Sequence, residues 1–135
     1  REGGDQQIDL ALLQELDPVG RDDRHEFELH TQPLGKVGGE VSAEDGKALA
    51  RICGLNALAA VHALVGIDSV VRIVKVVGFV ASAPGFNGQP AVINGASELM
   101  GEVFGPAGAH ARSAVGVSEL PLNAPVEVEL IVEVV

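Results

Sequence analysis

A long run of mostly β-branched residues near the middle of the chain constrains the fold more than any other segment. It extends from Ser69 to Ala81 and reads S-V-V-R-I-V-K-V-V-G-F-V-A. So apolar a run is typical of a strand that other structure covers on both faces, and we predict a central strand. Arg72 and Lys75, three residues apart, are expected on opposite faces of it, which would place polar neighbours on both, as at a subunit interface.

Helical spacing of apolar residues on either side of this strand predicts two helices. The first begins after Ser42, whose hydroxyl can accept a hydrogen bond from the backbone N–H of Asp45, and ends at Gly66. The second begins at Pro90 and ends at Gly105-Pro106. The first apolar stripe comprises Leu49, Ile52, Cys53, Ala59, Ala60 and Ala63. The second comprises Val92, Ile93, Ala96, Leu99, Met100, Val103 and Phe104.

Two further strands are predicted at the C-terminal end, from about Ala111 to Val117 and from about Val126 to Val135. Side chains alternate between the faces of a strand, so Arg112 shares a face with the small residues Ala114 and Gly116. In the last strand apolar side chains occupy one face and carboxylates dominate the other. The carboxylates are those of Glu127, Glu129 and Glu133.

These elements predict one α+β domain over residues 1–135, with the helices on one face of a mixed sheet. Residues 1–37 form an atypical segment: Ile8–Leu16 fits a helix or a strand equally well, and Glu26–Thr31 carries a weak strand signal. A valine-rich sheet covered on one side needs a cover for its other face, and self-association is the economical solution.

Composition limits the classes of partner. Nine basic residues stand against nineteen acidic ones, a net charge of −10, and Trp and Tyr are absent; this argues against nucleic acid. The apolar stretch Ile67–Ala83 contains three charged residues and is a poor membrane span. With no signal peptide and one cysteine, Cys53, we expect a cytoplasmic protein with no membrane partner.

Few other residues suggest chemistry. Cys53 lies in the apolar stripe of the first helix and is expected to pack as a small hydrophobe. The four histidines lack metal-ligand spacing, so no metal site is predicted. His110 precedes the Arg112 strand and either borders a cleft there or is an ordinary loop residue. Arg112 itself has two interpretations: a surface residue in an Arg–Glu ion pair, or an anchor for a carboxylate or phosphate near an activating Glu.

The segment A-R-S-A-V-G-V-x-x-L-P, followed by P-V-E-V-E, resembles the C-terminal signature of the reactive intermediate deaminase family (Rid, also called YjgF). The resemblance extends over about Gly38 to Val135. It includes the helix A-R-I-C-G-L-N-A-L-A-A-V, which holds Asn56, and the segment F-N-G-Q-P-A-V-I-N, which holds Asn94. It implies a chorismate-mutase-like β-α-β-β-α-β fold that forms a homotrimer, with clefts between subunits.

The resemblance also implies an activity: hydrolytic deamination of reactive 2-imino and enamine acids, such as 2-aminoacrylate, to 2-keto acids and ammonia without a metal or organic cofactor. Arg112 would hold the substrate carboxylate and keep the nearby Glu127 ionised. Glu127, rather than Glu129 on the same face, would position the attacking water. Asn94 would form a polar wall, and the backbone of Ala114 would line the site.

The N-terminal segment departs from the family. Family members carry a Gly-rich Ser-Gly-Gln-type turn there and often an aromatic residue that reaches the cleft, whereas Gln14-Glu15 stands in that place here. An alternative function is therefore a non-catalytic trimer that binds a small carboxylate through Arg112. Ribonuclease activity, sometimes attached to the family, conflicts with the acidic composition.

Overall fold

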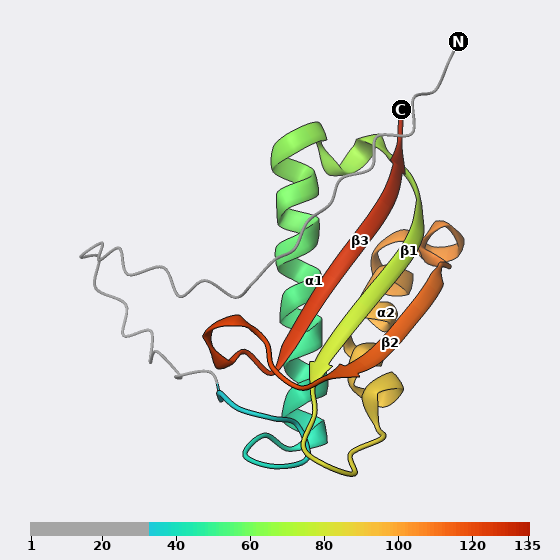
Figure 1. Cartoon of the computed structure of the whole chain (residues 1–135). Coiled ribbons are helices and arrows are strands. Elements are labelled where there is room, and N and C mark those ends of the chain that lie inside the picture. Colours follow the sequence, from blue (N-terminus) through green and yellow to red (C-terminus); the bar gives the residue numbers. More distant parts are fainter. Residues whose placement is uncertain (1–32) are drawn as a thin grey trace, which may run out of the picture.

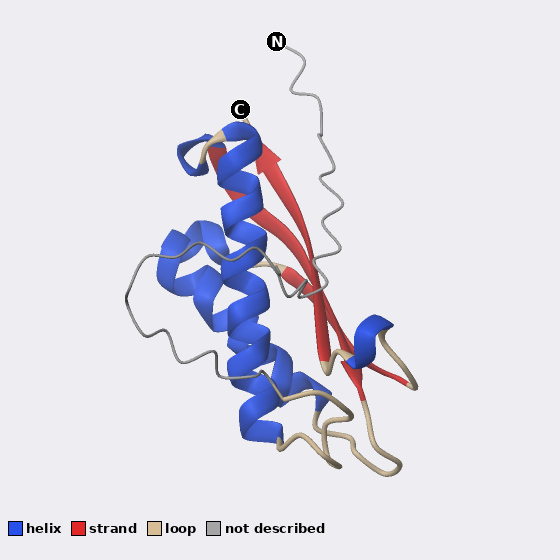
Figure 2. Cartoon of the chain, turned by 90° about the vertical axis from the view of Figure 1, so that its left-hand side faces the viewer, coloured by secondary structure: helices blue, strands red, loops and turns tan. Residues whose placement is uncertain are grey.

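The computed structural model describes residues 33–135, in which two helices cover one face of a three-stranded sheet (Figures 1 and 2). The helices and strands, in chain order, are α1 (Ala43–Val65), β1 (Val70–Ala81), α2 (Gln89–Phe104), β2 (Ala111–Val117) and β3 (Val126–Val134). Single 3₁₀ turns follow α1, α2 and β2: Ile67–Ser69, Gly105–Gly108 and Pro121–Asn123. The sequences Ile8–Leu16 and Glu26–Thr31, for which strands or a helix were considered, lie outside the described residues.

The sheet has the strand order β2-β1-β3, so the apolar run forms the central strand, as predicted. β1 pairs in parallel with β2 and antiparallel with β3, which makes the sheet mixed. The α+β architecture with helices on one face is therefore confirmed. The order β-α-β-β-α-β is not found, because a single strand separates α1 from α2 and two strands follow α2.

A β-bulge in β1 overturns the expectation for Arg72 and Lys75. Ile73 pairs with Val132 but Lys75 pairs with Ile131, so one extra residue of β1 has no partner between them. Each bulge shifts the alternation of faces by one residue. Arg72 and Lys75 consequently lie on the same face of the sheet, the one turned away from the helices.

The first helix begins as predicted. The Ser42 hydroxyl accepts from the N–H of Asp45, at 3.0 Å, and Gly66 caps the other end with φ of 80°. The apolar stripe predicted for this helix was wrong in its C-terminal half. Ala59 and Ala63 are exposed, while the side chains that pack inward there are Ala57, Leu58 and Val61.

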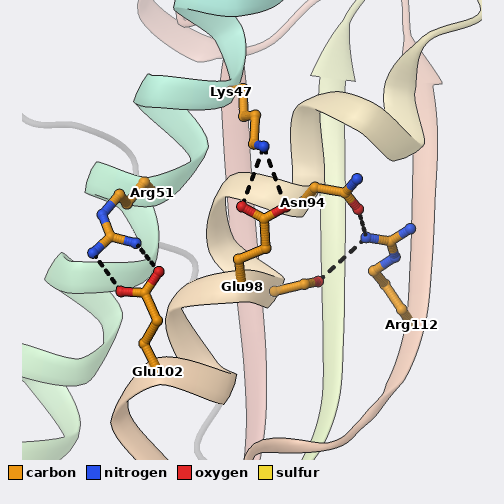
Figure 3. A network of polar contacts seen from close by, with 7 residues as sticks. Lys47, Arg51, Asn94, Glu98, Glu102 and Arg112 are labelled. Carbon is orange, nitrogen blue, oxygen red and sulfur yellow. Dashed lines mark hydrogen bonds and ion pairs between the residues drawn. The ribbon is translucent and has the colours of Figure 1, made fainter.

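The two helices approach each other closely at Gly95 of α2. A Cβ atom at this position would lie 2.0 Å from the carbonyl oxygen of Lys47 in α1. Two ion pairs then connect the helices at their surface, Lys47 to Glu98 at 3.2 Å and Arg51 to Glu102 at 2.8 Å (Figure 3). This packing fixes α2 relative to the sheet, and therefore fixes whatever side chains α2 directs toward β2.

The first helix is also long and apolar enough to cross a membrane, a test that core helices of soluble proteins pass equally. In this fold its apolar side packs on α2 and β3, where Leu49, Cys53 and Val61 are almost completely buried. The segment Ile67–Ala83, judged a poor membrane span, forms a strand for most of its length.

The described part of the N-terminal segment is attached to the strand ends. Val37 is completely buried, and its N–H donates to the carbonyl of Ala81 at 2.7 Å. The N–H of Gly35 donates to the carbonyl of Asn123, and Lys36 forms an ion pair with Glu119 at 2.9 Å. This segment therefore covers the end of the sheet at which β1 and β2 finish.

Candidate functional site

The side chain of Arg112 lies between β2 and α2. Its Nη1 donates to Oδ1 of Asn94 at 2.7 Å and to Oγ of Ser97 at 3.3 Å (Figure 3). Asn94 and Ser97 are three residues apart and therefore project from the same side of α2. The structure thus brings together two of the residues singled out in the sequence, Asn94 and Arg112, and adds Ser97.

Arg112, Ala114 and Gly116 share one face of β2, as predicted, and pairing with Val76, Gly78 and Val80 of β1 shows that this is the helix side of the sheet. Ala114 packs against the hydrophobic core. A Cβ atom at Gly116 would lie only 2.8 Å from the side-chain nitrogen of Gln89, the first residue of α2. Small residues after Arg112 therefore let β2 lie close to α2, and this closeness brings the guanidinium within reach of Asn94.

The guanidinium of Arg112 has no carboxylate partner among residues 33–135. The other two arginines in this range form ion pairs, Arg51 with Glu102 and Arg72 with Glu133. Nη1 of Arg112 donates to two neutral oxygens. The edge formed by Nε and Nη2 has no acceptor within the described residues. Among residues 33–135 the surface Arg–Glu ion pair considered for Arg112 is thus not found, and a guanidinium edge with two N–H donors is suited to a carboxylate.

His110 contacts the same serine hydroxyl as Arg112. Its Nε2 lies 3.0 Å from Ser97 Oγ, and its Nδ1 lies 2.6 Å from the carbonyl oxygen of Gly108. His110 is therefore not merely a loop residue, because it contacts the same hydroxyl as Arg112. Sequence reasoning missed Ser97. The signal that could have found it was its spacing of three residues from Asn94.

Glu127 lies on the opposite face of the sheet from Arg112. Its neighbours Val126 and Val128 are buried on the helix side, which directs Glu127 to the other side. The strand order β2-β1-β3 places the two residues on opposite edge strands. Within one chain, the arrangement therefore separates Arg112 from Glu127.

The electrostatic surroundings of Glu127 differ from those expected. The pKa of its carboxyl is raised, first by burial and second by the neighbouring charge of Glu129. An adjacent arginine would lower that pKa instead. The expectation that Arg112 keeps Glu127 ionised is therefore not met within one chain, because the guanidinium is on the other face.

Cys53 packs in the core, as predicted. Its thiol is directed at the carbonyl oxygen of Val126, and burial raises its pKa to about 11. A thiol with so high a pKa stays protonated near neutral pH and is a poor nucleophile. No group of three or more His, Cys, Asp or Glu side chains gathers as a metal site within residues 33–135.

A shallow depression of about 230 Å³ lies between α1 and α2, lined by Glu44, Lys47, Ala48, Arg51, Gly95 and Glu98. Its cations are paired, Lys47 with Glu98 and Arg51 with Glu102 (Figure 3). The cations at this depression therefore already have carboxylate partners and hold the two helices together, whereas Arg112 forms no such ion pair within residues 33–135.

Comparison with known proteins relates most of the described chain to one family. The family model described as endoribonuclease L-PSP matches residues 30–134. The curated protein TCP17 of Trypanosoma cruzi is 46% identical over 101 residues, which cover 73% of this chain and 63% of that protein. The chain thus spans less than two thirds of the length of this relative.

Two solved structures are also similar. The first is the protein Atu1372 of Agrobacterium tumefaciens, whose function is unknown. It is 44% identical with a TM-score of 0.74, and the match covers 76% of this chain and 66% of that one. The second, from Shewanella oneidensis, is provisionally assigned as an endoribonuclease. It is 29% identical with a TM-score of 0.72, and the match covers 76% and 68% of the two chains.

Proposed function

Because the chain belongs to the endoribonuclease L-PSP family, which is the YjgF/Rid family, we propose that it hydrolyses reactive 2-imino acids and their enamine tautomers to 2-keto acids and ammonia. The observation that supports this most is the state of Arg112. Its guanidinium donates to two neutral oxygens, and no acceptor among residues 33–135 contacts its Nε and Nη2 edge, which can therefore bind a ligand. A 2-imino acid offers the planar carboxylate that such an edge binds with two hydrogen bonds.

The second part of the proposal is that the working site forms between copies of the chain in a homotrimer. Arg112 and Glu127 lie on opposite faces of the sheet, so one chain alone does not assemble them. The face turned away from α1 and α2 carries Val77, Phe79 and Ile131 as well as the carboxylates, and neither of these helices covers it (Figure 2). A neighbouring copy would cover this apolar surface and place its own Arg112 near Glu127.

In such a site the reaction needs orientation and proton transfer. Arg112 would hold the carboxylate of the imine, whose C=N carbon is already electrophilic. Glu127 would accept a proton from water as its oxygen adds to the carbon of the N-protonated imine, giving a neutral carbinolamine. Glu127 would then return this proton to the nitrogen. As the nitrogen leaves as ammonia, the C=O bond would form and the hydroxyl proton would pass to the Glu127 carboxylate, which releases it to solvent. No metal or organic cofactor takes part in these steps, and the proposed setting is the cytoplasm.

A measurement of imine hydrolysis tests this function. The imine 2-iminopropanoate is generated from alanine by an amino-acid oxidase, and pyruvate formation above the spontaneous rate is followed. Arg112→Ala should lower kcat/KM at least about 100-fold, because two charge-assisted hydrogen bonds are lost. Arg51→Ala is the matched control, since this arginine lies on the far helix and contacts Glu102, and it should stay within about twofold.

The alternative function is a non-catalytic protein that binds small carboxylates through the same arginine. It predicts that the wild type binds pyruvate, that Arg112→Ala does not, and that neither accelerates imine hydrolysis. The family description and the Shewanella relative name an endoribonuclease instead, and the net charge of −10 speaks against an RNA substrate for this chain. Equal imine hydrolysis by the wild type and Arg112→Ala would rule out the proposed site.

A further inference from the structure

We propose that Ser97, itself held by His110, is a positioning residue that orients the guanidinium of Arg112 for carboxylate binding. This inference rests on the proposed function and adds two residues to its site. The observation behind it is an unbroken series of hydrogen bonds. It runs from the Gly108 carbonyl through His110 and Ser97 to Arg112 Nη1, with distances of 2.6, 3.0 and 3.3 Å.

The chemistry of the end groups fixes the direction of every bond in the series. The carbonyl of Gly108 can only accept, so the proton of a neutral His110 is on Nδ1. Its Nε2 then carries a lone pair and accepts from the hydroxyl of Ser97. At the other end Arg112 can only donate, so the same oxygen accepts from Nη1. Ser97 is thereby held with an oxygen lone pair toward the guanidinium, in an orientation that a freely rotating hydroxyl would not keep.

The start of the series is itself fixed by packing. Gly108 is buried, and a Cβ atom there would lie 2.1 Å from the carbonyl oxygen of Met100 in α2. Only a glycine lets the turn after α2 press against the end of this helix so closely. Gly108 and Ser97 are therefore both positioned by α2, and His110 bridges them. The geometry of the series is set by one rigid element rather than by a surface loop.

The arrangement positions Arg112 without neutralising it. Nη1 donates to Asn94 and to Ser97, and both acceptors are uncharged oxygens. The planar guanidinium is then fixed in rotation, and its remaining edge, Nε with Nη2, is presented to the ligand. A carboxylate in place of Ser97 would orient the group equally well but would compete with the substrate for its charge.

Kinetics and ligand binding of four variants test the role. Ser97→Ala should weaken pyruvate binding, measured by NMR titration, and raise KM for 2-iminopropanoate, each about tenfold, while kcat changes less than about threefold. Ser97→Thr keeps the hydroxyl and should restore binding. In His110→Gln the side-chain carbonyl oxygen lies at the position of Nε2 and can still accept from Ser97, so this variant should resemble the wild type. In His110→Asn the shorter side chain can reach the Gly108 carbonyl but not the Ser97 hydroxyl, so this variant should resemble Ser97→Ala. Ser118→Ala, exposed after β2, is the control.

The outcomes separate this inference from the proposed function. If Arg112→Ala is inactive but Ser97→Ala is unchanged in KM and in pyruvate binding, the positioning role is overturned and the function stands. If the wild type neither hydrolyses the imine nor binds pyruvate, the function fails. The role of Ser97 is then decided by the exchange rate of the Arg112 Nε–H with water, read by NMR. Faster exchange in Ser97→Ala supports it, and an unchanged rate overturns it.

Discussion

At the scale of single residues, the site depends on two charged side chains that form no ion pair within residues 33–135. Arg112 is surrounded by neutral acceptors, and Glu127 lies on the other face beside a second carboxylate. The candidate residues Arg112, Glu127, Asn94 and Ala114 follow from the sequence resemblance. Alternation correctly predicted that Arg112 and Ala114 share a face of β2 and that Glu127 lies on the face of β3 opposite Val126 and Val128. Ser97 was missed, although its spacing of three residues from Asn94 places both residues on one side of α2; this spacing gains meaning only once Arg112 is known to lie beside that side.

In a single chain, where no arginine among residues 33–135 lies beside Glu127, the raised pKa of Glu127 predicts how stability depends on pH. Because the folded state binds the proton more tightly than the unfolded state, stability falls as pH rises through the range from the ordinary value of 4.5 up to the folded pKa. Glu127→Gln should therefore be more stable than the wild type at neutral pH and lose this advantage near pH 4. Urea unfolding at several values between about pH 4 and pH 8 measures the difference.

Glu127→Gln should also lower kcat for imine hydrolysis by about 100-fold or more, since Glu127 is the proposed proton acceptor. Glu129→Gln is the matched control, because it removes the neighbouring carboxylate on the same face of β3. If Glu129→Gln loses the activity and Glu127→Gln keeps it, the assignment of the two residues is reversed.

At the scale of elements, the sequence predicted the strands and helices to within a few residues, because strong caps and clear periodicities mark their ends. Two local features escaped it. The bulge in β1 puts Arg72 and Lys75 on one face, and a bulge leaves no sign in a run of valines. The buried side chains in the second half of α1 are Ala57, Leu58 and Val61. The sequence did not identify them, because alanines at several neighbouring positions fit more than one helical face.

Close contact between the helices gives a prediction about stability. Gly95→Ala would place a Cβ atom 2.0 Å from the Lys47 carbonyl, so the helices must separate, and we expect a loss of about 2 kcal/mol or more. Gly101→Ala on the same helix is the control. Apart from the adjoining backbone of its own helix, no atom of residues 33–135 lies within 4 Å of its added Cβ, and helix propensity should make Gly101→Ala more stable by about 0.5–1 kcal/mol. Thermal or urea unfolding compares them, and equal stability of the two variants would contradict the packing described.

At the scale of the whole molecule, one face of the sheet is covered by α1 and α2 and the other is not covered within residues 33–135 (Figure 2). The sequence suggested self-association through the valine-rich sheet. It could not reveal that Arg112 and Glu127 are kept apart in one chain, because that depends on strand order. The proposed trimer reconciles the two observations, since neighbouring copies would supply the two halves of each site.

Complementation between two inactive variants tests this central claim most directly. Arg112→Ala and Glu127→Gln are each purified, then unfolded together and refolded as a mixture, and imine hydrolysis is measured. If each site takes Arg112 from one chain and Glu127 from its neighbour, random mixing makes about one site in four intact. We predict that the mixture recovers about a quarter of the wild-type rate while each variant alone stays inactive. A co-refolded mixture as inactive as its components would contradict the shared site.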